Sequence, residues 1–411
     1  MMKAYIISIG DELTKGEIVN SNAAYIAREL TECGISVAAI FSLPDREKDA
    51  ALFVNAMLKN SGLFLFTGGL GATRDDLTRR IISAALKKRL VVDGECIRIL
   101  EKWYAKKGRP FTESDRMQAS YPEGGRLLRN PIGLAFGFYV SSDERHIFSL
   151  PGVPKEMEYM FSEEVLPKIR KDFADNGHYH TETLLFSDIP EYTLDHRLGE
   201  IISHHRGVRY GTRSSDGLIR VRVDSRVGEV EPCIRDCIHS LGDYYICRGG
   251  FNLEGVVGEL LMQRDLVLSV AESCTAGYLS KIITDVPGSS RYFSGGVVSY
   301  SNDVKIGVLG VSQETLRHFG AVSSETAVQM AKGVKERFSS DISLSITGIA
   351  GPDGGSKEKP VGTVYICLYR NEHEFEVQKQ YFPGDREGIR KRSVNRALFL
   401  LFKYLKGLDR S

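Results

Sequence analysis

The first 170 residues alternate between short apolar runs and longer segments in which apolar side chains recur every three or four positions. Residues 5–9 and 63–66 are apolar runs of strand length, and the second is apolar throughout. Such strands are typical of a parallel sheet covered on both faces. The other elements predicted here are helices at 21–33, about 45–58 and 76–86, a strand at 35–40, and a hairpin formed by 137–140 and 146–150. This order predicts a doubly wound α/β domain with its ligand site at the carboxyl ends of the strands.

The pattern changes after about residue 170. Residues 217–223 alternate apolar and charged side chains, as a strand with one face in solvent does. A helix at 230–241 and a strand at 244–246 follow, which together indicate a small α+β unit.

A third pattern begins near residue 252 and predicts another α/β unit. Its predicted elements are helices at 253–263, 323–338 and 387–405 and strands at 266–270, 342–346, 361–369 and 374–382. We therefore predict a multidomain α/β protein: a doubly wound domain at 1–170, an α+β connector at 171–250 and a C-terminal α/β domain at 251–411.

Composition adds little that is specific. The chain has 411 residues, which favours two to four domains, and 42% are hydrophobic, as in ordinary globular proteins. With 54 Lys and Arg against 53 Asp and Glu, the net charge of +1 argues against a dedicated nucleic-acid or membrane surface. No apolar run is long enough to cross a bilayer. The seven cysteines form no Cys-x-x-Cys pair, so we expect reduced thiols and a cytoplasmic location.

A glycine-rich segment at 67–76 follows the apolar strand and ends in two carboxylates. Its glycines permit positive φ and let the backbone approach an anion, and the following helix offers unpaired N–H groups. Asp75 and Asp76 make sense if one caps the helix and another holds a divalent cation. Asp11 and Glu12 supply two more carboxylates at the same sheet edge, and Asp11, Asp75 and Asp76 are the candidate metal ligands. A tight turn with an aspartate cap and no ligand is the alternative.

The C-terminal unit has the residues for amide hydrolysis, but no histidine lies within 266–309. Lysine is then the candidate base, and Lys305 must be neutral to act, which requires burial or a nearby cation. Ser290 lies in a turn that exposes a hydroxyl, Tyr300 is suited to relay a proton or orient the lysine, and Ser273 is suited to bind phosphate or an oxyanion. Each has a plain alternative: Ser273 as a helix cap, Ser290 as a turn residue, Tyr300 in the core and Lys305 in solvent.

A second glycine loop at 347–355 follows another apolar strand and could form the opposite wall of the same pocket. Lys359 and Arg386 are possible partners for a phosphate there.

Several ordered motifs resemble the CinA family. The segments 10–16, 67–76 and 150–157 resemble its N-terminal domain, which is similar to the molybdopterin-binding MoaB/MogA fold. The resemblance implies metal-dependent hydrolysis of ADP-ribose to AMP and ribose 5-phosphate, with Mg, Mn or Co as the cation. The chain departs from the family pattern at Ala72 and Phe136, where the family usually has proline. The substrate residues implied are Gly68, Gly69, Gly71 and Thr73, and the metal ligands are Asp11, Asp75 and Asp76.

The segments from 272–275 to 384–386 resemble the C-terminal domain of the family, a nicotinamide mononucleotide deamidase of the PncC type. The resemblance implies Ser290 as nucleophile, Lys305 and Tyr300 as its activating partners, and no metal in the reaction. It implies conversion of nicotinamide mononucleotide to nicotinic acid mononucleotide and ammonia. The substrate residues implied are Ser273, Thr275, Thr347, Gly348, Gly351 and Arg386.

The sequence therefore predicts a bifunctional pyridine-nucleotide hydrolase whose partners are small nucleotides, and the resemblance implies a homodimer. Two other classes stay open. The N-terminal domain is a binding module if it holds a nucleotide or pterin without hydrolysing it. A DNA-associated factor is the third class, and the balanced charge argues against it.

Overall fold

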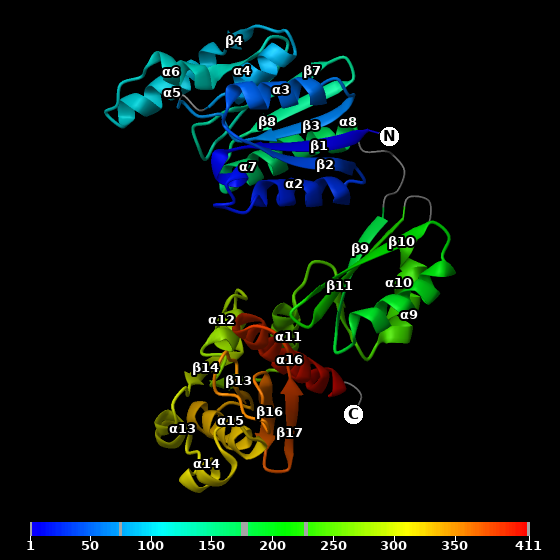
Figure 1. Cartoon of the computed structure of the whole chain (residues 1–411), viewed down its shortest axis with the longest axis vertical. Coiled ribbons are helices and arrows are strands. Elements are labelled where there is room, and N and C mark those ends of the chain that lie inside the picture. The colour runs from blue at the N-terminus through cyan, green and yellow to red at the C-terminus, as the bar shows by residue number, and fades with distance from the viewer. Residues whose placement is uncertain (1, 74–75, 174–179, 226–228, 409–411) are drawn as a thin grey trace. The chain divides into compact units, whose positions relative to one another are not determined.

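The computed structural model describes residues 2–73, 76–173, 180–225 and 229–408. By internal contacts the chain forms two compact units, residues 1–179 and 180–411 (Figure 1). The second unit contains residues 180–250 of the predicted connector and the whole predicted C-terminal domain, and the three-domain boundaries stay a prediction. All seven cysteines are free thiols. Among the helices of the described residues, none combines the length and apolar content needed to cross a membrane.

The first unit is built on a six-stranded sheet in the order β2-β1-β3-β8-β7-β6. The first four strands are parallel, and β7 and β6 continue the sheet antiparallel, so the predicted hairpin is β7–β8. The sheet strands are β1 (Lys3–Ile9), β2 (Ser36–Leu43), β3 (Gly62–Thr67), β6 (Arg126–Leu128), β7 (Gly137–Ser142) and β8 (Arg145–Leu150).

Helices cover both faces of this sheet (Figure 1). On one face Ile6 and Leu65 pack with Ile26 of α2 and Met157 of α7. On the other face the strands pack against α3 and α4. The helices of the unit are α1 (Asp11–Thr14), α2 (Ser21–Glu32), α3 (Glu47–Met57), α4 (Thr78–Ala85), α5 (Gly94–Lys106), α6 (Glu113–Arg116), α7 (Pro154–Met160) and α8 (Leu166–Asp172). The predicted doubly wound α/β fold is confirmed.

Two short segments lie beside this core and had no prediction. A small two-stranded sheet joins β4 (Leu90–Val92) to β5 (Ser120–Pro122), after the 3-10 helix η1 (Met117–Ala119). A π-helical turn, η2 (Phe161–Val165), separates α7 from α8.

The second unit begins with a four-stranded antiparallel sheet in the order β10-β11-β9-β12, with α9 and α10 on one face. Alternate residues of its strands face opposite ways: Phe186 packs with α9 and α10, whereas Leu185 joins the core of the C-terminal sheet and helices. The α+β character predicted for this region is therefore observed. Its elements are β9 (His180–Ser187), α9 (Glu191–Ser203), β10 (Val208–Ser215), β11 (Leu218–Ser225), α10 (Val230–Leu241) and β12 (Tyr245–Arg248).

The rest of the second unit has a five-stranded sheet in the order β14-β13-β15-β16-β17. The first three strands are parallel and the last two antiparallel. The largest core cluster of the chain includes residues of α11, α12 and α16, and α15 packs with the sheet in separate clusters. The elements are α11 (Leu253–Gln263), β13 (Leu268–Glu272), α12 (Tyr278–Thr284), η3 (Ser289–Arg291), β14 (Phe293–Val298), α13 (Asn302–Leu309), α14 (Gln313–Phe319), α15 (Ser324–Phe338), β15 (Ile342–Gly348), β16 (Thr363–Asn371), β17 (Glu374–Tyr381) and α16 (Arg386–Gly407).

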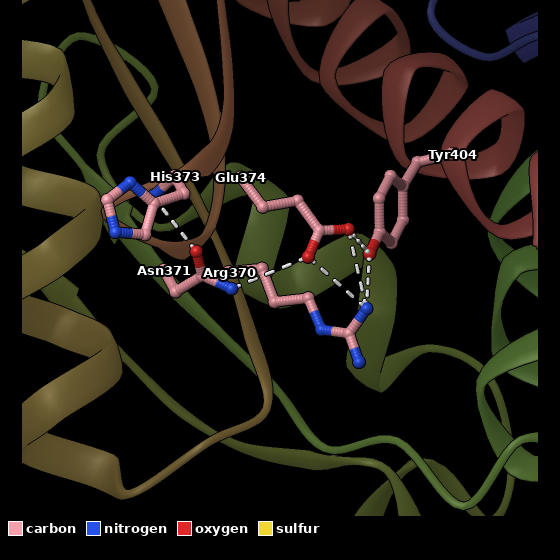
Figure 2. Close-up of polar contacts among 5 residues, drawn as sticks. All are labelled: Arg370, Asn371, His373, Glu374 and Tyr404. Carbon is pink, nitrogen blue, oxygen red and sulfur yellow. Dashed lines mark hydrogen bonds and ion pairs between the residues drawn. The ribbon is translucent and has the colours of Figure 1, made fainter.

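A polar cluster ties the last helix to the β16–β17 hairpin (Figure 2). The Tyr404 hydroxyl donates to Glu374 at 2.6 Å and accepts from the Arg370 guanidinium at 2.9 Å. The hairpin turn is closed by the His373 amide, which donates to the Asn371 side chain at 2.9 Å. These contacts fix one end of α16, whose other end carries Arg386.

Candidate functional site

A cavity of about 640 Å³ lies at the carboxyl ends of the parallel strands in the first unit. Gly10 follows β1, Gly68 follows β3 and Gly152 follows β8, and all three border the cavity. This is the place that a doubly wound sheet offers to ligands. Of the residues predicted to bind substrate, Gly68, Gly69, Gly71 and Thr73 border it together.

The glycines at the start of this loop are required by close packing. Gly68 has a φ of +92°, and a Cβ there would overlap the carbonyl oxygen of Ile9. Gly69 has a φ of +64°, and its Cβ would overlap the hydroxyl of Thr78. That hydroxyl donates to the Gly68 carbonyl at 2.8 Å. Both positions therefore need glycine for conformation and for space.

Asp76 closes the glycine loop. Its carboxylate accepts from the Gly71 amide at 2.7 Å, the Thr73 amide at 2.7 Å and the Thr73 hydroxyl at 2.6 Å. The α4 helix begins after Leu77 without a side-chain cap. The expected helix-capping role is therefore wrong for Asp76, because its oxygens are already engaged by the loop. Asp75 lies outside the described residues.

Asp11 forms a reciprocal pair with the loop that follows β2. Its amide donates to the Asp45 carboxylate at 3.0 Å, and its carboxylate accepts from the Asp45 amide at 3.1 Å. The carboxylate also contacts the Lys15 ammonium at 2.9 Å. Lys15, followed by the Asp45 amide, holds the pKa of Asp11 below its usual value. Asp11 is not among the residues bordering the cavity, whereas Asp76 is.

The acidic residues bordering the cavity are Glu12, Asp45, Asp76 and Glu156. Glu156 accepts a hydrogen bond from Asn130 at 2.6 Å. Within the described residues, no three Asp, Glu, His or Cys side chains are grouped as a ready-made metal site. Their hard oxygen chemistry nevertheless suits Mg²⁺, which binds through one or two carboxylates together with substrate phosphates.

Asn22, which borders the cavity, makes only some of the hydrogen bonds that its side chain can form. Its Nδ2 donates to the Gly152 carbonyl at 2.8 Å, while its buried Oδ1 has no partner in the described part of the chain. In the same region of the structure, no acceptor is found for the amides of Gly69 and Leu70. A buried polar atom without a partner is costly and is a common mark of a ligand site.

The second unit has a different kind of site, centred on Lys305 of α13. The side chain is 1% exposed, and its ammonium donates to the Ser299 carbonyl at 2.7 Å and the Ser273 hydroxyl at 3.1 Å. The Tyr300 carbonyl lies 3.5 Å away. None of these acceptors is a carboxylate, and burial lowers the pKa of Lys305. The plain alternative of a solvated lysine is excluded.

Ser273 and Thr275 lie on the loop between β13 and α12, which Glu272 holds in place. The fully buried Glu272 carboxylate accepts from the amides of Leu279 and Ser280 at 3.0 and 2.8 Å. The Arg390 guanidinium donates to the Thr275 carbonyl at 2.7 Å. The Thr275 hydroxyl is buried without a partner in the described residues.

Ser290 and Tyr300 are exposed, unlike the buried Lys305. Ser290 is exposed on η3, and it is not among the hydrogen-bond partners of the Lys305 ammonium in the described chain. Tyr300 is 60% exposed, and its hydroxyl accepts from Arg386 at 3.2 Å. The expected core position of Tyr300 as an alternative is therefore wrong, and only its backbone carbonyl faces the lysine.

The second glycine loop and Tyr300 both contact Arg386, the first residue of α16. The Arg386 guanidinium donates to the Gly351 carbonyl at 2.6 Å. The Thr347 hydroxyl donates to the Ala321 carbonyl at 2.6 Å, and a Cβ on Gly348 would overlap the adjacent strand β16.

Lys359 is engaged by backbone. Its ammonium donates to the carbonyls of Phe319 and Val322 at 2.8 and 2.7 Å. Arg386, with an exposed side chain, is therefore the better placed of the two proposed phosphate partners.

Three contributions had no sequence signal of their own. Ser299 acts through its backbone carbonyl, Arg390 reaches Thr275 from 115 residues away in the chain, and the buried Arg79 contacts loops of the first unit. Such contacts depend on tertiary packing, and a single sequence does not display them.

The chain therefore joins two kinds of α/β domain. The first is MoaB/MogA-like, and the second contains the buried Lys305. Residues 5–171 match the family model described as a probable molybdopterin binding domain, and residues 251–405 match the CinA C-terminal domain. A relative from Halothermothrix orenii is 39% identical over 415 residues, covering 98% of this chain and 99% of the relative. A CinA-like protein of Syntrophomonas wolfei is 36% identical over 414 residues, covering 99% of both chains. The chain belongs to the CinA family.

Solved structures are also similar to part of this chain. The competence/damage inducible protein CihA of Agrobacterium tumefaciens is 37% identical, with a TM-score of 0.37, and the match covers 38% of this chain and 97% of that one.

Proposed function

We propose that the C-terminal domain hydrolyses nicotinamide mononucleotide to nicotinic acid mononucleotide and ammonia. The observation that carries the proposal is the buried Lys305 ammonium, which contacts Ser273 and has no carboxylate partner in the described chain. Burial favours the neutral amine, the form that accepts a proton. A serine activated by a lysine is one of the established solutions for amide hydrolysis.

In the proposed reaction Ser290 is the nucleophile, because its hydroxyl is exposed to a substrate whereas Ser273 is only 8% exposed. Its proton passes to the neutral amine of Lys305, directly or through the Ser273 hydroxyl, as its Oγ attacks the carboxamide carbon. Ammonia leaves with a proton returned by Lys305, and water then hydrolyses the acyl-enzyme to the carboxylate. Catalytic hydrogen bonds often tighten only when substrate binds, so the open geometry at Ser290 is compatible with this role.

Other residues of this domain would hold the nucleotide. Arg386 is exposed beside Tyr300 and suits the 5′-phosphate. The buried and unpaired Thr275 hydroxyl, with Ser273 and the loop carrying Thr347, Gly348 and Gly351, suits the rest of the ligand. No step of this reaction needs a metal.

For the N-terminal domain we propose metal-dependent hydrolysis of ADP-ribose. The support is the cavity behind the glycine loop, with the free amides of Gly69 and Leu70 among the described residues for phosphate and four carboxylates around it. A divalent cation (Mg, Mn or Co) would neutralise charge on the diphosphate. Asp76, Glu12 and Asp45 border the cavity and are suited to hold the cation, whereas Asp11 is not among the residues that border the cavity.

A specific observation favours a second candidate function for this domain. Both oxygens of Asp76 are engaged by loop donors, which suits a carboxylate that shapes the loop. The domain would then bind a nucleotide or a molybdopterin-like ligand without turning it over. Formation of AMP from ADP-ribose separates the two functions, because a binding module gives saturable binding and no product.

The test of the main proposal is ammonia release from nicotinamide mononucleotide by the purified chain, with and without EDTA. Release that survives chelation supports the serine and lysine reaction. A folded sample that releases no ammonia would reduce the domain to a nucleotide-binding module. ADP-ribose hydrolysis, measured in parallel, should stop in EDTA and return with Mg²⁺, Mn²⁺ or Co²⁺. The oligomeric state, which we propose to be a homodimer, follows from light scattering on the same sample.

A further inference from the structure

The N-terminal site is supported from beneath by a buried arginine. Arg79 is the second residue of α4 and is 2% exposed. Its Nη1 donates to the Leu70 carbonyl at 2.7 Å and its Nε to the Ser120 carbonyl at 3.0 Å. Its Nη2 donates to the carbonyls of Gln118 and Phe136 at 3.1 and 2.7 Å. One guanidinium thus holds four backbone carbonyls.

Three of the four carbonyls come from separate segments that border the same cavity. Leu70 belongs to the glycine loop, Gln118 to the 3-10 helix η1, and Phe136 follows Ala135. Leu70, Gln118 and Ala135 each border the cavity of about 640 Å³. Arg79 therefore fixes three parts of the cavity wall relative to one another.

Core packing alone does not explain an arginine at this place. All four acceptors are neutral, and no carboxylate among the described residues is hydrogen-bonded to the guanidinium. Burial lowers the pKa of Arg79 to about 10, so the group stays charged at neutral pH. A buried charge of this kind is costly unless it is hydrogen-bonded, and the four carbonyls supply those hydrogen bonds.

The arginine and Asp76 act on the two ends of one peptide bond. The carbonyl of Leu70 accepts from Arg79 at 2.7 Å, and the amide of Gly71, on the same peptide, donates to Asp76 at 2.7 Å. A cation and an anion thus hold this peptide plane in one orientation. The neighbouring amides of Gly69 and Leu70, which have no acceptor in the described residues, belong to the two preceding peptides, whose carbonyls accept from the Thr78 hydroxyl at 2.8 Å and the Thr78 amide at 3.2 Å.

We propose that Arg79 is a positioning residue of the N-terminal site: with Asp76 it fixes the Leu70–Gly71 peptide and preorganises the glycine loop for the phosphate groups of a nucleotide. The assignment of the ligand rests on the function proposed above for this cavity. A preorganised loop loses less entropy when it binds, so loss of the guanidinium should weaken binding.

The test compares Arg79→Lys, Arg79→Met and the control Arg80→Met. Lysine keeps the positive charge, but its single ammonium lacks the planar set of donors with which the guanidinium binds four carbonyls. Methionine keeps only the bulk of the side chain. Arg80 is the exposed neighbour on the same helix. The first readout is amide hydrogen exchange at Gly71 and Thr73 compared with amides of β3. The second is the dissociation constant for ADP-ribose with Mg²⁺.

Both Arg79 variants should exchange at least tenfold faster at Gly71 and Thr73, with β3 unchanged, and should bind ADP-ribose at least tenfold more weakly. Arg80→Met should resemble the wild type in both readouts. Unchanged loop exchange in the Arg79 variants, a uniform increase that includes β3, or failure of both to fold would overturn the proposal. If the wild type does not bind ADP-ribose, the proposed function of the cavity fails, and the exchange data still decide whether Arg79 positions the loop.

Discussion

The Lys305 ammonium lies 3.1 Å from the Ser273 hydroxyl, although the two residues are 32 positions apart in the chain. The parallel pairing of β13 with β14 makes this contact possible, because it brings the loop after β13 beside the start of α13. Burial lowers the pKa of the lysine, and the acceptors of its hydrogen bonds within the described residues are neutral oxygens. A lysine in this environment is better suited to accept a proton than to hold an anion.

Replacement of Lys305 by methionine should abolish ammonia release, by about 100-fold or more, because the proton acceptor is lost. The substitution retains bulk and removes a buried charge, so the fold should survive. Lys281→Met is the matched control, since Lys281 is exposed on α12 and pairs with Asp285. Ammonia release is measured beside circular dichroism. Activity of Lys305→Met near that of the control would exclude the lysine as the base.

The pH dependence follows from the lowered pKa of Lys305, whose ordinary value is 10.5. Ammonia release should rise as pH increases through the folded-state pKa, because only the neutral amine accepts a proton.

The free energy of unfolding should change with pH in the same direction as the activity. Below the folded-state pKa the Lys305 ammonium is charged in both the folded and the unfolded chain, so folding carries the full cost of burying the charge. Between that pKa and 10.5 the unfolded chain binds the extra proton, so the free energy of unfolding rises with pH. Urea titrations across this range should show the rise in the wild type and a smaller one in Lys305→Met.

The two serines should separate by their kinetics. Ser290→Ala removes the proposed nucleophile and should abolish turnover while nicotinamide mononucleotide still binds. Ser273→Ala removes one hydrogen bond to Lys305, so kcat should fall while a residual rate remains, with an altered pH profile. Ammonia release and equilibrium binding are measured for both. The opposite ranking, with Ser290→Ala active and Ser273→Ala dead, would make Ser273 the nucleophile.

Asp76→Ala should remove ADP-ribose hydrolysis and leave ammonia release intact, because the two sites lie in separate units. The carboxylate accepts three hydrogen bonds that close the glycine loop. Bonds to a charged group are worth roughly 1.5–3 kcal/mol each, so the loop should open without it. Both activities are assayed on one preparation. Simultaneous loss of both would point to misfolding.

Much of the fold could be predicted because its elements have strong local signals. The helix at 230–241 and the strand pair β16–β17 agree with the apolar patterns, and Ser323 caps α15 by accepting from the Thr326 amide. The segment between α4 and β6 was not predicted: its strands β4 and β5 have only three residues each, whereas α5 does carry a helical signal, with Asp93 as its cap and Cys96, Ile97 and Leu100 on its buried face.

The candidate sites were predictable in part. The glycine loops could be placed from their spacing, and Lys305 could be named as the candidate base from the absence of a nearby histidine, but the sequence leaves its burial open. The partners of these residues could not, since Lys305 binds a backbone carbonyl of Ser299 and Asp76 binds the loop it follows. Nearly every residue type has the same backbone donor and acceptor, so a hydrogen bond to backbone cannot be recognised from the sequence.

Gly68 and Gly16 offer a test of the tight packing at the N-terminal site. Both have positive φ, +92° and +73°, so alanine is strained by about 1–2 kcal/mol at either position. A Cβ at Gly16 would meet nothing within 4 Å, whereas at Gly68 it would overlap the Ile9 carbonyl.

Gly68→Ala should therefore destabilise the first unit by about 1–3 kcal/mol more than Gly16→Ala does. It should also abolish ADP-ribose hydrolysis, because relief of the overlap must separate the glycine loop from the end of β1, and both segments border the cavity. The measurement is urea unfolding followed by the fluorescence of Trp103, the one tryptophan of the chain, which lies in the first unit. Equal destabilisation by the two variants would mean that the loop shifts without cost, and the site would then be less rigid than its packing implies.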